Sequence, residues 1–227
     1  MIRISVKNVS KKFKIGIEKS QTVLAKFASL FSGVEPKKTI LVINNISLLV
    51  NSGELLGIIG NNGGGKSTLL RIIAGIYRPD SGMVAINGKT ISLISLQVGL
   101  KDRLTMRENI FLVGSLFGMS QDVLKNKMSS IIEFSGLKEF INTKLYQFSV
   151  GMRQRLAFSV AINAAPDILL LDEVLEVGDS DFKEKSGNKI KELVKQGVSV
   201  VFVSHDLDMI HKYCDRVIEL EKGQIIG

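Results

Sequence analysis

The feature that most constrains the fold is a glycine-rich segment between an apolar run and a helical pattern. Residues 60–68 read Gly-Asn-Asn-Gly-Gly-Gly-Lys-Ser-Thr and fit the pattern G-x-x-x-x-G-K-[ST]. The apolar residues 55–60 predict a short buried strand of a parallel sheet, and residues 66–77 predict a helix. Because glycine has no Cβ, such a backbone can fold closely around phosphate groups with its N–H groups pointing inward.

Every residue of this segment is therefore a candidate for binding ATP: Gly60, Asn61, Asn62, Gly63, Gly64, Gly65, Lys66, Ser67 and Thr68. The Lys66 ammonium can reach the β- and γ-phosphates, and the Ser67 hydroxyl can ligate Mg²⁺. The N-terminus of the following helix adds the positive end of its dipole. The alternative is a strand–helix turn that binds no ligand, and the flanking strand and helix favour the phosphate-binding interpretation.

A second apolar run ends in two carboxylates. Residues 168–173 read Ile-Leu-Leu-Leu-Asp-Glu. Open α/β sheets bind ligands at the carboxyl ends of their strands, so we expect Asp172 to hold Mg²⁺ and Glu173 to orient or deprotonate an attacking water. Taken alone, such a run is about as often a solvated strand end, and the phosphate-binding segment in the same chain favours the catalytic interpretation.

Strands and helices alternate along the chain from Leu55 onward. Besides the runs already named, periodicity predicts strands at residues 2–9, 41–50 and 198–203 and helices at 182–196 and 206–213. This alternation favours an α/β fold with a mostly parallel sheet and helices on both of its faces.

Two segments interrupt the alternation within what we expect to be a single domain over residues 1–227. Residues 105–164 look mostly helical, which predicts a helical subdomain at about 100–165 inserted between sheet strands. An insert at about 15–40 carries an amphipathic helical stripe over residues 21–32.

Residues 148–155, Phe-Ser-Val-Gly-Met-Arg-Gln-Arg, resemble the L-S-G-G-Q-x-Q-R signature of the ABC ATPases. Ser149, Gly151 and Gln154 match the signature, whereas Val150 and Met152 depart from it. A serine hydroxyl and glycine N–H groups at the start of a helix make an anion site, so Ser149 and Gly151 are candidates for nucleotide contact. Ser149 is also expected as an ordinary helix N-cap, and the two roles are compatible.

Other positions resemble the family's landmarks in order. Gly178-Asp179 matches the D-loop, and His205 matches the switch histidine at a strand end; with Lys66 and Glu173 it completes the implied catalytic set. Phe13 is the candidate aromatic for stacking on adenine, with a core phenylalanine as its alternative. Gln97 is the candidate Q-loop ligand of Mg²⁺, although it lies eight residues before Thr105, where many relatives have nine.

Narrower features resemble the ATPases of polysaccharide, O-antigen, capsule and teichoic-acid exporters. Residues 172–179, Asp-Glu-Val-Leu-Glu-Val-Gly-Asp, lack the proline that most ABC proteins have after the glutamate, and residues 149–158 resemble the group's S-S-G-M-R-x-R-L-A-F. The insert at about 15–40 is similar to an amphipathic helix of this group near the membrane interface. Some members add a C-terminal carbohydrate-binding domain; this chain stops at Gly227, as a member without that domain or as part of a longer protein.

The resemblance implies an ABC-type P-loop fold with an N-terminal antiparallel β subdomain, and a head-to-tail homodimer that sandwiches two ATP and Mg²⁺. It implies a multi-spanning membrane transport subunit as partner, and a peripheral position on the cytoplasmic face of the inner membrane. The resemblance does not identify which glycan is exported. The alternatives are the ATPase of another exporter or lipid transporter, a soluble ABC ATPase acting on nucleic acid, and an ATP-gated scaffold without hydrolysis.

The net charge of +8 first suggests a polyanionic partner, but residues 1–40 alone contribute nine basic and two acidic groups, or +7. We therefore expect no nucleic-acid partner, and a basic N-terminal segment that either is only solvated or faces anionic lipid headgroups or partner loops.

A single cysteine excludes an intrachain disulfide. No apolar run reaches about 18 residues, and we expect no secretory leader after Met1.

Overall fold

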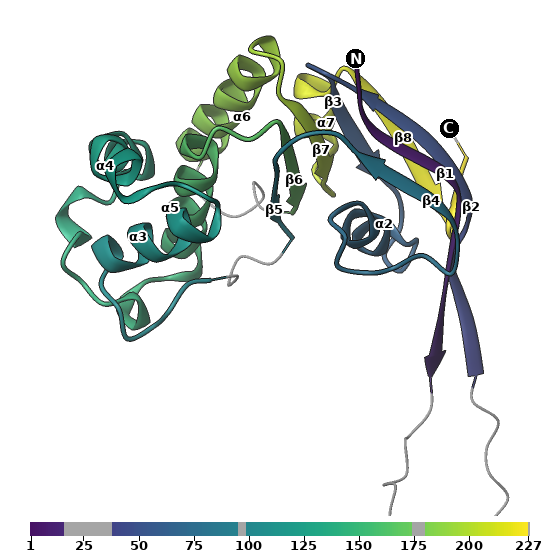
Figure 1. Cartoon of the computed structure of the whole chain (residues 1–227), viewed down its shortest axis with the longest axis horizontal. Coiled ribbons are helices and arrows are strands. Elements are labelled where there is room, and N and C mark those ends of the chain that lie inside the picture. The colour runs from purple at the N-terminus through teal and green to yellow at the C-terminus, as the bar shows by residue number, and fades with distance from the viewer. Residues whose placement is uncertain (16–37, 95–98, 174–179, 227) are drawn as a thin grey trace, which may run out of the picture.

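The computed structural model describes residues 1–15, 38–94, 99–173 and 180–226. The proposed insert helix at 21–32, Gln97 and the D-loop pair Gly178-Asp179 lie outside the described residues. Figure 1 shows the arrangement, with a helical lobe on one side, an antiparallel sheet on the other and a second sheet between them.

The first sheet is antiparallel and has the order β2-β1-β4. Its strands are β1 (Ile2–Ile15), β2 (Lys38–Asn51) and β4 (Ser81–Ile86). Buried and exposed side chains alternate along β2, as expected for strands with one face on the core and one in water. This confirms the expected N-terminal antiparallel β subdomain.

The second sheet has the order β5-β6-β7-β3-β8-β9, and all its neighbours are parallel except β8 and β9. Its strands are β3 (Leu55–Ile59), β5 (Thr90–Leu93), β6 (Ile168–Asp172), β7 (Ser199–Val203), β8 (Arg216–Glu221) and β9 (Gln224–Ile225). The central strand β7 is buried along its whole length, which explains the apolar sequence that follows Ser199. The mostly parallel core sheet is thus confirmed.

The α-helices within the described residues are α2 (Lys66–Ile73), α3 (Met106–Leu116), α4 (Gln121–Ser135), α5 (Val150–Asn163), α6 (Ser180–Lys195) and α7 (Leu207–Tyr213). Two 3₁₀ turns, η1 (Lys138–Phe140) and η2 (Leu145–Gln147), lead from α4 to α5. Helices α3, α4 and α5 lie between β5 and β6 in the chain, where the helical subdomain is expected. Thr105 and Glu108 form a capping box that begins α3, and Gly136 ends α4 at φ 67°.

Two apolar cores lie on the two faces of the parallel sheet. Along β6, Leu169 and Leu171 pack with the helical subdomain, α6 and α7, whereas Ile168 and Leu170 pack with α2 and the antiparallel sheet. This alternation follows from the period of two along a strand. The strand therefore has both faces covered and only its carboxyl end open, and the candidate site is built at this end.

The sequence prediction differs from the structure in several elements. Strand β1 continues to Ile15, whereas the prediction ended it at residue 9. Strands β4 and β5 were not predicted, because β4 is mostly exposed and β5 has only four residues. Helix α2 ends at Ile73 rather than near residue 77. Within the described residues, no helix combines the length and apolar character needed to cross a membrane.

Candidate functional site

The glycine-rich loop from Gly60 to Gly65 connects the carboxyl end of β3 to the first turn of α2. Gly60, Gly63 and Gly65 have φ values of 134°, 79° and 106°, a region that favours glycine. A Cβ on Gly60 would collide with the Leu220 carbonyl oxygen, whereas a Cβ on Gly63 would meet no atom of the described residues within 4 Å. Packing against β8 thus accounts for Gly60, but it leaves open space beside Gly63 at the exposed tip of the loop.

Lys66 is the first residue of α2, and its side chain folds back across the loop. The ammonium donates to the Gly60 carbonyl at 2.7 Å and to the Asn61 carbonyl at 3.1 Å, and the residue is only 5% exposed. A buried ammonium group at the start of a helix favours an anionic ligand. The loop therefore fits the phosphates of a nucleotide, and Asn61 and Asn62 lie exposed beside Gly63.

Ser67 and Asp172 come together although 105 residues separate them. The Ser67 hydroxyl donates to Asp172 Oδ1 at 3.2 Å. Burial, and to a smaller extent Glu173, raises the pKa of Asp172 above its ordinary value of 3.8, while Ser67, Arg71 and Lys66 partly offset the shift. A hydroxyl beside a partly buried carboxylate is the oxygen donor set that suits Mg²⁺.

Glu173 and His205 meet at the ends of the neighbouring strands β6 and β7. His205 Nε2 lies 3.0 Å from Glu173 Oε1, and the two side chains are 39% and 49% exposed. The Glu173 backbone has a φ of 56°, and its N–H donates to the Val203 carbonyl at 2.9 Å. A carboxylate reachable by water and held by an imidazole can orient water or take its proton.

Asp206 supports His205 and was not among the predicted site residues. Its Oδ1 accepts from the Met209 N–H at 3.1 Å as the N-cap of α7, and its Oδ2 lies 3.6 Å from the Lys183 ammonium on α6. The sequence signal was an aspartate directly before a helical pattern. The cap and the ion pair fix the turn that carries His205.

Ser149 is the N-cap of α5, as expected. Its hydroxyl accepts from the Met152 N–H at 3.2 Å, and its side chain and that of Val150 are exposed. Gly151 lies in the first turn of α5. Figure 1 shows α5 and α2 on opposite sides of β5 and β6, so the helix that Ser149 caps lies apart from the helix that follows the glycine-rich loop.

The structure places Phe13 on β1, where its ring packs edge to face on Tyr77 with a centroid distance of 5.4 Å. The Lys11 ammonium lies 5.5 Å from the Phe13 centroid. These contacts lie outside the glycine-rich loop, so a role for Phe13 in stacking on adenine stays a prediction. The role of Gln97 also stays a prediction.

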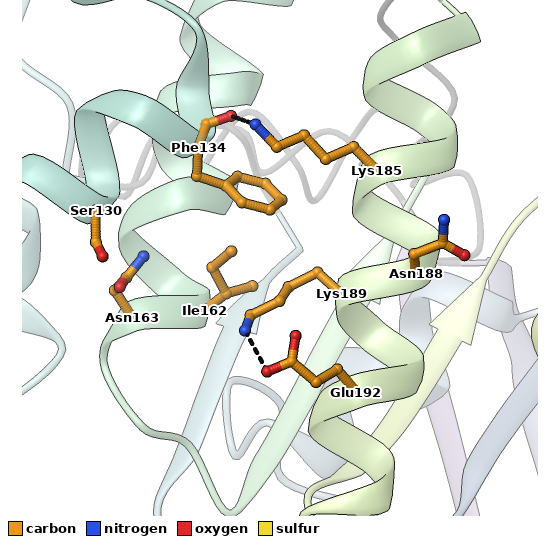
Figure 2. Close-up of a pocket in the computed structure, with 8 residues that line it drawn as sticks. All are labelled: Ser130, Phe134, Ile162, Asn163, Lys185, Asn188, Lys189 and Glu192. Atoms are coloured by element: carbon orange, nitrogen blue, oxygen red, sulfur yellow. Dashed lines mark hydrogen bonds and ion pairs between the residues drawn. The ribbon is translucent and has the colours of Figure 1, made fainter.

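A cavity of about 440 Å³ lies elsewhere, between α4, α5 and α6 (Figure 2). It is lined by Ser130, Phe134, Ile162, Asn163, Lys185, Asn188, Lys189 and Glu192. The Lys185 ammonium donates to the Phe134 carbonyl at 3.1 Å, and Lys189 pairs with Glu192 at 2.8 Å. Because both lysines are already bonded to groups of the protein and no predicted site residue lines the cavity, we interpret it as a packing junction between helices.

Comparison with known proteins agrees with this geometry. The sequence pattern of the family described as ABC transporter matches residues 43–176. The chain is 38% identical to the ABC transporter protein AbcA of Aeromonas salmonicida over 93% of this chain and 70% of that protein. It is 42% identical to the teichoic acids export ATP-binding protein TagH of Listeria innocua, over 99% of this chain and 66% of that protein. It is also 42% identical to the O-antigen export system ATP-binding protein RfbB of Klebsiella pneumoniae, over 82% of this chain and 75% of that protein.

Among solved structures, the dimeric post-hydrolysis state of the ATP-binding cassette MJ0796, bound to ADP and Pi, has a TM-score of 0.81 with this chain. The sequences are 27% identical, and the alignment covers 99% of this chain and 97% of that one. The fold is therefore that of an ATP-binding cassette. The chain belongs to the ABC transporter family and carries its ATPase domain, while it spans about two thirds of the TagH relative that it matches.

Proposed function

We propose that this chain is the ATP-hydrolysing motor of an ABC exporter that moves a lipid-linked polysaccharide, such as a teichoic acid or an O-antigen, across the bacterial inner membrane. The observation that carries the ATPase part is the convergence of Lys66, Ser67, Asp172, Glu173 and His205 at the carboxyl ends of β3, β6 and β7. The polysaccharide part is supported by relatives named for teichoic-acid and O-antigen export at about 40% identity.

In this mechanism the glycine-rich loop and Lys66 hold the β- and γ-phosphates of ATP. Ser67 and Asp172 would hold Mg²⁺, which neutralises charge on the phosphates when it is bound. Glu173 orients water for attack on the γ-phosphorus and takes its proton, and His205 keeps that carboxylate in place. Since all of these residues are on one chain while Ser149 lies away from them, the site is completed by Ser149 and Gly151 of a second copy in a head-to-tail dimer.

The motor needs a membrane partner, because a cassette that closes on ATP does no transport without a pathway for the substrate. We propose a multi-spanning transport subunit in the inner membrane, with this chain peripheral on its cytoplasmic face. The basic residues near the start of the chain suit anionic lipid headgroups; in the described part Lys7, Lys12, Lys14 and Lys38 are exposed.

The experiment that tests the ATPase assignment is Glu173→Gln in the full chain. Removing the base while keeping the shape should lower the hydrolysis rate by roughly 10²–10⁴-fold and accumulate an ATP-bound dimer. Steady-state phosphate release and size-exclusion chromatography with ATP measure both effects. Hydrolysis at the wild-type rate would contradict the assignment of Glu173 as base.

The substrate assignment is tested in cells of the source bacterium that lack this chain. Lipid-linked glycan should accumulate on the cytoplasmic leaflet and disappear from the surface, and the wild-type chain but not the Glu173→Gln variant should restore export. Normal surface glycan in the deletion strain would contradict polysaccharide export while leaving the ATPase assignment intact.

A further inference from the structure

Two segments far apart in sequence lie side by side before the signature helix. Residues 102–107, which lead into α3, pair with residues 141–146, which lead to α5. The backbone hydrogen bonds join Tyr146 N–H to Asp102 O, Leu145 N–H to Leu104 O, Met106 N–H to Thr143 O and Arg107 N–H to Ile141 O, at 2.9–3.1 Å. The two segments therefore form one rigid unit.

Arg153 connects this unit to the first turn of α5. Its Nη2 donates to the Leu145 carbonyl at 2.7 Å, its Nε donates to the Phe148 carbonyl at 3.4 Å, and its Nη1 pairs with the Asp102 carboxylate. The planar guanidinium holds its donors in a fixed fork, so these three contacts specify an orientation as well as a distance.

These contacts surround the entry to α5. Phe148 directly precedes Ser149, and Arg153 lies four residues after it, so both ends of the turn that presents the serine are attached to the same guanidinium. The backbone also connects Arg153 to the serine, because the Arg153 N–H donates to the Ser149 carbonyl at 3.1 Å. A change in the Asp102 loop would thus move the Ser149 hydroxyl.

We propose that Arg153 and Asp102 are positioning residues that orient Ser149 toward the nucleotide held by the second copy of the chain. The inference rests on the proposed dimer. The Arg153 side chain is 20% exposed and the Asp102 side chain 61% exposed. Because exposed ion pairs contribute little to stability, the pair acts on the direction of the signature turn more than on the stability of the fold.

The test uses the full chain with Glu173→Gln as a background in which ATP-driven dimers accumulate. Adding Asp102→Asn removes the ion pair and leaves the glycine-rich loop intact. The ATP concentration for half-maximal dimer should rise at least about threefold, because the contact is lost at both sites of the dimer. The affinity of the monomer for a fluorescent ATP analogue and the thermal midpoint should stay unchanged.

Three further variants sharpen the result. Arg153→Gln removes all three contacts and should raise the same ATP concentration by roughly tenfold or more. Asp102→Glu keeps the charge and should restore dimer formation. Arg103→Gln removes an exposed charge from the neighbouring position and should have no effect on dimer formation.

The outcomes separate the two proposals. If Glu173→Gln alone forms no dimer with ATP, the proposed dimer fails and the inference fails with it. If it forms a dimer and Asp102→Asn leaves the ATP dependence unchanged, only the positioning role is overturned. A loss of thermal stability or of monomer nucleotide affinity in Asp102→Asn that matches its loss of dimer would also overturn it, because the pair would then be merely structural.

Discussion

At the scale of single residues, the glycines of the glycine-rich loop are required for different reasons. Gly60 and Gly64 lack a Cβ because the Leu220 backbone lies against them, which is a demand of packing. Among the described residues no atom lies within 4 Å of a Cβ placed on Gly63, so packing does not account for this glycine, whereas its φ of 79° and a bound phosphate would.

This difference predicts that Gly63→Ala weakens ATP binding more than it weakens the fold. A methyl group would enter the space where we expect phosphate, while the left-handed backbone costs about 1 kcal/mol of unfolding free energy. Gly75→Ala is the matched control, since Gly75 also has a positive φ, 74°, and open space around it. Calorimetric ATP titration and denaturant unfolding of both variants check this, and equal ATP affinity in both would contradict the ligand interpretation.

Asp172 gives a prediction that depends on pH. Because burial raises its folded-state pKa above the ordinary 3.8, the ionised carboxylate destabilises the fold, and this cost appears as pH rises through the folded-state pKa. Without nucleotide or Mg²⁺, Asp172→Asn should be more stable than wild type at pH 7, by up to about 1 kcal/mol, and should lose this advantage below the ordinary pKa. Urea unfolding across that pH range measures it. If Asp172→Asn is instead less stable than wild type at pH 7, the ionised Asp172 carboxylate stabilises the fold, and this prediction is wrong.

At the scale of elements, the caps of the helical subdomain let structural and functional roles be compared. Ser149 caps α5 and Ser120 caps α4, each hydroxyl accepting an N–H bond from the residue three positions later. Either change to alanine should cost about 1 kcal/mol of unfolding free energy. Only Ser149→Ala should also lower the ATPase rate, because only α5 carries the signature. Steady-state rates and thermal unfolding test this, and equal rates in both variants would reduce Ser149 to an ordinary cap.

The elements also show where sequence reasoning was sufficient. The strands β3, β6 and β7 have buried, mostly apolar sequences, so their pattern predicted the strands themselves. The chemistry at their ends was predicted from the glycine-rich motif and from the family resemblance. Strand β4 is mostly exposed and pairs with β1 over long sequence separation, so local periodicity left it unpredicted.

At the scale of the whole molecule, the separation of α5 from the glycine-rich loop predicts that two copies share each active site. Lys66→Ala and Ser149→Ala should each be nearly inactive alone. Mixed chains can form dimers with one site made of two intact halves, because the glycine-rich loop of one variant meets the signature of the other. Activity should then recover to at most about a quarter of wild type in an equal mixture.

Phosphate release by the mixture, compared with the sum of the two separate variants, decides this. A mixture of Lys66→Ala with Glu173→Gln is the control, since both changes fall on the same half of the site and no dimer regains an intact one. Recovery in the control mixture, or none in the test mixture, would contradict the shared site.

The sequence by itself predicted which residues carry the chemistry. The loop from Gly60 to Lys66 has a local sequence motif, and the carboxylates follow an apolar run, so both could be recognised without knowing their neighbours. Only the tertiary structure decided which groups meet. Ser67 reaches Asp172 and Glu173 reaches His205 because the sheet order places β6, β7 and β3 side by side, and no local pattern specifies that order. The same reason hid the pairing of Arg153 with Asp102, since 51 residues separate them and only the folded chain brings their charges into contact.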